Sequence, residues 1–125
     1  EWHQPYFDTF KNIFGYAAPS RLSLTSHMMI LNHDKLKEMK KELEKKHNKS
    51  WQAVYISTAS STENSCISDY DTYANWMIYN YPNEVKIYPF YNKSAGRKDM
   101  APFIELCKKH SKLKSISFHS YIDGA

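Results

Sequence analysis

Two carboxylates separated by a single residue are the feature of this sequence that most suggests chemistry. Asp69 and Asp71 lie in the stretch SCISDYDTYANWMIYNYP, residues 65–82, together with four tyrosines and a tryptophan. Two acids in a D-x-D spacing can share a divalent cation, because such cations take carboxylate oxygens as ligands. A metal-binding pair normally follows an apolar strand, whereas this one follows Ser-Cys-Ile-Ser and precedes a helical pattern. Acids at helix positions i and i+2 point about 200° apart, so a shared ion is not expected here.

The same residues fit the start of a helix. Ser68 and Asp71 have the spacing of a capping box, in which the serine hydroxyl accepts from the Asp71 N–H and the Asp71 carboxylate accepts from the Ser68 N–H. This interpretation uses Asp71 and leaves Asp69 without a structural task. Any acid in the first turn of a helix is stabilised by the helix dipole. Asp69 is therefore either a surface acid at a helix start or a carboxylate held there for chemistry.

Helices and strands alternate along the chain that must position these acids. Residues 21–30, RLSLTSHMMI, alternate apolar and polar side chains and predict a half-buried strand. Two further strands and a turn are predicted at residues 84–90, 114–121 and 92–98 respectively. Helices are predicted at about residues 5–14, from a cap at Asn32 or Asp34 to 46, at 51–58, at 69–80 and at 100–110. Strands separated by helices indicate an α/β fold.

The charge of the chain is modest and locally balanced. Its 125 residues carry 17 Lys and Arg against 13 Asp and Glu, a formal net charge of +4. Seven of the lysines lie in residues 35–49, but Glu38, Glu42 and Glu44 alternate with them, as on a solvated helix face with i,i+4 pairs. Nucleic acid is therefore not the expected partner. A small basic binding module for nucleic acid or a protein is the alternative, because ten tyrosines can stack on bases.

Length, hydropathy and cysteines bound the other possibilities. We expect residues 1–125 to form a single domain, and no apolar run approaches the roughly 20 residues of a membrane-spanning helix. Cys66 and Cys107 are far apart and outside any CxxC, which favours a reduced, cytoplasmic setting without zinc. The glycosylation patterns at Asn48 and Asn92 leave a secretory setting open. Since the chain begins without Met, we expect it to be a portion of a longer polypeptide.

Several segments carry a family resemblance in their order and spacing. They are Ser26-His27-Met28, His47-Asn48 with Trp51, Ser68-Asp69-Tyr70-Asp71 with Tyr73, and Tyr81-Pro82. Together they resemble a group of bacterial and viral glycosyltransferase-like proteins. In that family a strand with a Ser-His-Met element leads into a helix, then a His-Asn-x-x-Trp segment, a Ser-Glu-Tyr-Glu-x-Tyr motif and a His-Pro or Tyr-Pro stop. The resemblance extends over residues 5 to 92.

The resemblance implies a GT-A-like fold, a mixed sheet flanked by helices, which transfers a sugar from a nucleotide-sugar donor to a hydroxyl of a glycan or protein acceptor. This chain would be the acceptor-side, C-terminal portion of that fold. The resemblance implies that Asp69 is the general base on the acceptor hydroxyl. Around it, the expected substrate-binding residues are Ser68, Tyr70, Asp71 and Tyr73. The two tyrosines are either aromatic walls for a sugar ring or half-buried aromatics of a helix.

Two histidines are further candidate binding residues, and the sequence departs from the family pattern in two respects. Ser26 and His27 can bind phosphate or acceptor, although a histidine beside a strand end is more often structural. His119 is a candidate ligand for a divalent metal, Mn²⁺ or Mg²⁺, whose main ligands are expected outside this chain. Both acids of the motif are Asp instead of Glu, and the D-x-D strand is lacking along with the nucleotide-binding half. We therefore expect the chain by itself to be inactive.

Overall fold

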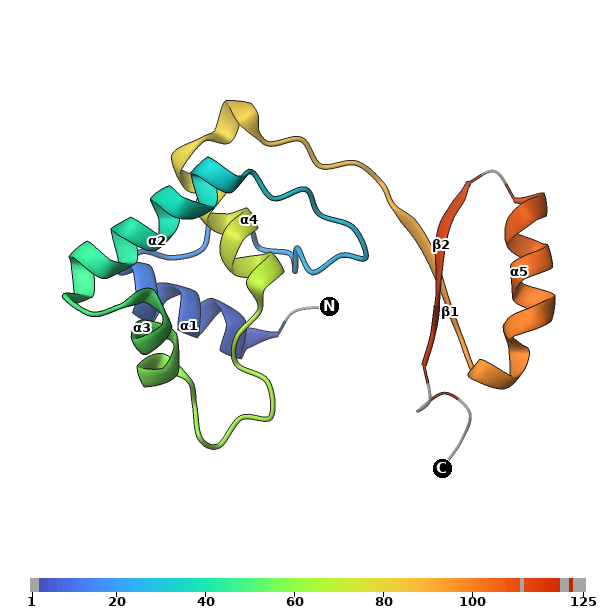
Figure 1. Ribbon diagram of the computed structural model, residues 1–125, viewed down its shortest axis with the longest axis horizontal. Coiled ribbons are helices and arrows are strands. Elements are labelled where there is room, and N and C mark those ends of the chain that lie inside the picture. Colours follow the sequence, from blue (N-terminus) through green and yellow to red (C-terminus); the bar gives the residue numbers. More distant parts are fainter. Residues whose placement is uncertain (1–2, 111, 120–121, 123–125) are drawn as a thin grey trace. The chain divides into compact units, whose positions relative to one another are not determined.

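A computed structural model describes residues 3–110, 112–119 and 122 of the chain. The described residues form five α-helices and a two-stranded parallel sheet, so the chain is α/β as the sequence predicts (Figure 1). Contacts between Cα atoms group the chain into two compact units, Glu1–Lys86 and Ile87–Ala125. The single domain expected from the sequence stays a prediction. The two units are described separately below.

The first unit consists of helices and the segments that connect them. In chain order they are α1 (Gln4–Phe14), α2 (His33–His47), α3 (Trp51–Thr58), α4 (Asp69–Asn80) and the short 3-10 helix η1 (Pro82–Glu84). Side chains at three helix starts accept hydrogen bonds from backbone N–H groups that have no partner within the helix. These caps are Asn32 for α2, Ser50 for α3 and Ser68 for α4. The predicted helices of this unit are confirmed.

One buried cluster holds the four helices of this unit together. It takes three residues from α1, two from α2, one from α3 and three from α4, namely Phe10, Ile13, Phe14, Met39, Leu43, Val54, Tyr73, Trp76 and Met77. Full burial of a side chain of this size contributes about 1.5 to 3 kcal/mol. The cluster fixes α4 against α2 and thereby fixes where the start of α4 presents its two acids.

The end of α1 is joined to the end of α2 by basic side chains. The His47 Nε2 atom lies 2.6 Å from the Ile13 carbonyl oxygen, and the Lys46 ammonium donates to the Phe14 carbonyl. The last carbonyls of a helix lack partners within it and favour positive charge. Gly15 ends α1 with φ of 78°, and an added Cβ would collide with the Lys46 side chain.

The prediction of a strand at residues 21–30 is wrong. The structure describes bends and irregular backbone there, with no strand pairing. Leu22 and Ile30, which the alternation placed on a buried face, are 76% and 82% exposed. The segment is held by side chains of α4 instead, because Asn75 accepts a hydrogen bond from the Ser20 N–H and Asp71 accepts one from the Leu24 N–H.

The second unit is a strand–helix–strand arrangement. Strand β1 (Tyr91–Ala95), the 3-10 helix η2 (Arg97–Asp99), helix α5 (Met100–Lys109) and strand β2 (Leu113–Phe118) follow one another, and α5 packs on β2. The strands pair in parallel, with Ala95 opposite Phe118 and an irregularity after Tyr91. The predicted strand at 84–90 is wrong, because η1 ends at Glu84 and residues 85–90 have no regular secondary structure. The predicted turn at 92–98 is wrong, because β1 occupies residues 92–95. Pro89 lacks the N–H that a strand interior needs. Residues 120 and 121 of the predicted last strand lie outside the described residues.

Within the described ranges, no helix combines the length and the apolar character needed to cross a membrane.

Candidate functional site

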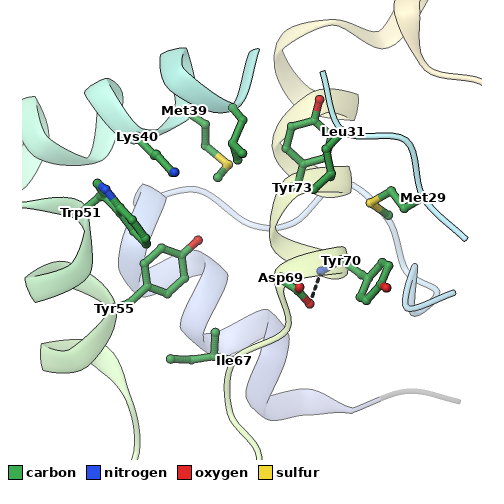
Figure 2. Close-up of a pocket in the computed structure, with 11 residues that line it drawn as sticks. Met29, Leu31, Met39, Lys40, Trp51, Tyr55, Ile67, Asp69, Tyr70 and Tyr73 are labelled. Atoms are coloured by element: carbon green, nitrogen blue, oxygen red, sulfur yellow. Dashed lines mark hydrogen bonds between the residues drawn. The ribbon is translucent and has the colours of Figure 1, made fainter. Parts of the chain in front are cut away.

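A cavity of about 480 Å³ opens in the first unit between α2, α3, the start of α4 and the segment before α2 (Figure 2). Most of its lining is apolar or aromatic. The lining residues are Met29, Leu31, Leu36, Met39, Lys40, Trp51, Tyr55, Ile67, Asp69, Tyr70 and Tyr73. Among these described residues, Asp69 is the only acid and Lys40 the only base. Apolar walls with a few polar groups are typical of a pocket for a small molecule.

Asp69 is the first residue of α4 and the one carboxylate of the lining. Its Oδ1 accepts a hydrogen bond of 2.9 Å from the Tyr70 N–H, the contact drawn in Figure 2. In the part of the chain that the structure describes, no group donates to its second carboxylate oxygen. The side chain is exposed, and the N-terminal end of the helix dipole favours its negative charge. Asp69 therefore has an oxygen available to a ligand in the pocket.

Asp71 lies on the opposite side of the same turn and is only 3% exposed. Its Oδ1 accepts from the Leu24 N–H at 2.6 Å, and its Oδ2 accepts from the hydroxyls of Thr25 at 2.6 Å and Ser23 at 3.1 Å. These bonds satisfy the buried carboxylate, which would otherwise be costly to bury. Asp71 is not among the residues that line the pocket.

The predicted capping box is half right. Ser68 Oγ accepts from the Asp71 N–H at 3.1 Å, as predicted. The return bond from the Ser68 N–H to the Asp71 carboxylate is absent among the described hydrogen bonds, because that carboxylate is directed to residues 23–25. Ser68 is buried and its hydroxyl also lies 3.2 Å from the Thr25 hydroxyl. The expected substrate-binding residues Ser68 and Asp71 therefore face the chain's own backbone and hydroxyls in this structure.

Four aromatic side chains give the pocket its walls. Tyr70 and Tyr73 come from α4, as expected, and Trp51 and Tyr55 come from α3 (Figure 2). The Tyr73 hydroxyl accepts from the Asn32 N–H at 3.0 Å and so joins α4 to the start of α2. Trp51 and Tyr55 contact edge to face, with ring centroids 6.2 Å apart.

Tyr55 stays neutral in this setting over the physiological range. Burial raises the pKa of its hydroxyl to about 12, the hydrogen bond with Thr72 opposes this, and the negative charge of Asp69 adds to the increase. A carboxylate disfavours ionisation of a nearby phenol because two like charges would face each other. The Tyr55 hydroxyl is therefore a proton-bearing group close to Asp69.

Besides Ser68 and Asp71, three further expected site residues lie outside the pocket. Ser26 donates to the Met28 carbonyl at 2.6 Å, and His27 beside it is exposed. Neither lines the cavity. His119 belongs to the second unit, where its N–H donates to the Ala95 carbonyl at 3.0 Å. The roles of these residues in binding stay predictions.

Lys40, Trp51 and Tyr55 were missed by sequence reasoning. Lys40 was assigned with its neighbours to a solvated helix face. A usable signal exists, because Trp51 and Tyr55 are four residues apart on a short helix and Leu36 and Lys40 share the same spacing on the preceding one. Residues at i and i+4 lie on one face of a helix, so two such faces can enclose a pocket.

A metal centre is not assembled by the described residues. They contain no group of three or more His, Cys, Asp and Glu side chains placed to hold an ion. The described side chains therefore do not fit a self-contained site for Mn²⁺ or Mg²⁺, because each of these ions takes several oxygen ligands. The expectation that the main ligands lie outside this chain stays a prediction.

Comparisons with protein-family models, with curated proteins and with solved structures found no match.

Proposed function

We propose that this chain is the acceptor-side part of a GT-A-like glycosyltransferase, which transfers a sugar from a nucleotide-sugar donor to a hydroxyl of a glycan or protein acceptor. In this proposal the pocket holds a sugar of the acceptor, and Asp69 is the general base. The supporting observation is the contrast between the two acids of the motif. Both carboxylate oxygens of Asp71 accept hydrogen bonds from residues 23–25, whereas Asp69 keeps one oxygen available within an aromatic pocket.

The walls of the pocket suit a sugar ring. Aromatic faces pack against the apolar C–H faces of a ring, while phenol hydroxyls and a carboxylate supply polar contacts at its edge. Trp51, Tyr55 and Tyr70 provide such faces, and Asp69 lies beside Tyr70 at the start of α4 (Figure 2). A volume of about 480 Å³ lies within the usual range for ligand pockets.

Asp69 would act while the acceptor hydroxyl attacks the donor. As the acceptor oxygen forms its bond to the anomeric carbon, the bond from that carbon to the nucleotide diphosphate breaks, and the diphosphate leaves with the electron pair. The acceptor hydroxyl proton passes to the free oxygen of Asp69. A positioned base of this kind contributes about 10² to 10⁴ in rate. Ionised Asp69 also favours a neutral Tyr55, which can donate a hydrogen bond to the sugar.

A cytoplasmic setting is part of this proposal. Cys66 and Cys107 are both free thiols, and unpaired cysteines are the usual state in a reducing compartment.

The proposal is tested by release of nucleotide diphosphate from the full-length protein supplied with nucleotide sugars and candidate acceptors. We expect Asp69→Asn to lower kcat by about 10² to 10⁴ with little change in the KM for acceptor, since a base acts in the transition state. Asp34→Asn is the matched control, because Asp34 is also a first-turn acid but is exposed and lies outside the pocket. Salt-dependent binding of single-stranded nucleic acid without any release of diphosphate would contradict the proposal.

A further inference from the structure

Lys40 places a positive charge on the wall of the pocket. It reaches from α2 toward the cavity, and its Nζ lies 4.4 Å from the centroid of the Trp51 ring (Figure 2). The side chain is half-buried among apolar and aromatic neighbours. A cation over an aromatic face is stabilised by the ring, but this contact leaves the other side of the ammonium open to an anion.

The nearest helical candidate for an ion pair with Lys40 is engaged elsewhere. Glu44 lies one turn further along α2, and its Oε1 accepts from the Trp51 N–H at 3.3 Å. Within the described part of the chain, none of the ion pairs includes Lys40. The Lys40 charge therefore has no carboxylate partner among the described ion pairs, which leaves it available to an anionic ligand in the pocket.

A second lysine of α2 shows that such a charge can be balanced within the chain. Lys35 lies over the Tyr81 ring, with its Nζ 3.0 Å from the centroid, and also pairs with Glu84 at 3.6 Å. Lys35 does not line the pocket. The two lysines make the same kind of ring contact, but only the one outside the pocket has a carboxylate partner. Of these two lysines, the one without a described carboxylate partner is therefore the one that lines the cavity.

We propose that the pocket takes a saccharide that bears an anionic substituent, a carboxylate or a phosphate, and that Lys40 pairs with this group. The inference rests on the proposed function, because the saccharide would be the acceptor. Asp69 gives the pocket its polarity, since its charge repels an anion and attracts a hydroxyl. The anionic substituent is therefore directed to Lys40, and a hydroxyl of the same molecule is directed to Asp69.

A nucleotide diphosphate fits these groups less well. Two phosphates need several cations or a set of free backbone N–H groups. The pocket offers one ammonium among its described residues, and the start of α4 already carries Asp69, Asp71 and the Ser68 cap. One anionic group per ligand matches the single lysine.

Binding in the absence of any donor tests the inference. The probes are glucuronic acid, glucose 6-phosphate, glucose and inorganic phosphate, titrated into the whole chain by calorimetry. At least one anionic sugar should bind ten-fold or more tightly than glucose, and which of the two does so distinguishes a carboxylate from a phosphate ligand. Lys40→Met should abolish this preference, and Lys40→Arg should keep it. Lys41→Met is the matched control, because Lys41 is exposed on the same helix and outside the pocket.

Several outcomes would overturn the inference. They are equal binding of glucose and both anionic sugars, no binding of any probe, or the same loss in the Lys41 variant as in Lys40→Met. Inorganic phosphate binding as tightly as glucose 6-phosphate would show an anion site without a saccharide. The result is separable from the proposed function, because binding is measured without any donor and depends on Lys40, whereas transfer depends on Asp69. Lys40-dependent binding together with unchanged transfer by Asp69→Asn would reject the proposed base and leave the ligand class standing.

Discussion

Asp69 and Asp71 start the same helix two residues apart, and their surroundings have little in common. Asp71 is buried and accepts three hydrogen bonds from residues 23–25, so its carboxylate joins a loop to α4. Asp69 is exposed at an aromatic pocket and accepts one described hydrogen bond, from the next residue. Two acids in one motif can thus differ, with one carboxylate fully engaged within the fold and the other keeping an oxygen available.

Removing the Asp71 carboxylate should have the largest effect on stability. Asp71→Ala leaves the Leu24 N–H and two hydroxyls without their acceptor, and we expect a loss of about 2 to 4 kcal/mol in the free energy of unfolding. Asp71→Asn should lose less, because the hydroxyls of Ser23 and Thr25 can accept from an amide. Urea unfolding measures both changes. Equal stability of Asp71→Ala and Asp69→Ala would contradict the claim that Asp71 stabilises the fold more than Asp69 does.

The stability of the chain at alkaline pH should depend on Tyr55, whose hydroxyl lies near Asp69. The folded-state pKa of Tyr55 is raised to about 12 from 10, mainly by burial, so the folded chain holds this proton more tightly than the unfolded chain. The contribution is therefore complete below pH 10 and is lost as the pH rises toward 12, by about 2 kcal/mol. Tyr16 has a pKa raised to about 12 as well and adds its own loss. Unfolding free energies from pH 9 to 11.5 should fall less steeply in Tyr55→Phe, and an unchanged slope would contradict this account of Tyr55.

Removing the Ser68 cap at the start of α4 should have a smaller effect on stability. Ser68→Ala removes the acceptor for the Asp71 N–H and should cost about 0.5 to 2 kcal/mol. Ser50→Ala removes the corresponding cap of α3, whose serine is exposed, and should cost less because water can replace the lost bond. Thermal unfolding of the two variants measures the difference. A larger loss in Ser50→Ala would show that burial of the Ser68 cap has no bearing on stability.

The helix starts of the first unit could be predicted from sequence because caps are local. Asn32, Ser50 and Ser68 each bond backbone groups two or three residues ahead, so the pattern and the contact lie in the same few residues. The same local reasoning separated Asp69 from Asp71, since the predicted capping box uses Ser68 and Asp71 and leaves the Asp69 carboxylate without a structural task.

Residues 21–30 could not be predicted in this way. Their alternation has the period of a strand, but the hydroxyls of Ser23 and Thr25 bond a carboxylate 46 to 48 residues away. Side-chain bonds of this range replace the backbone partners of a strand, and no local pattern encodes them. The pocket raised the same difficulty. Lys40 has the spacing of a solvated lysine. Its contact with the Trp51 ring arises only from the packing of α3 against α2.

The central claim is that Asp69 serves chemistry while its neighbour Asp71 serves the fold. The most direct test measures transfer rate and unfolding free energy on the same preparation of full-length Asp69→Asn. We predict transfer slower by about 10² to 10⁴, in a protein whose unfolding free energy stays within about 1 kcal/mol of the parent, the usual worth of a first-turn acid. Transfer at the parent rate by a folded Asp69→Asn variant would contradict the claim.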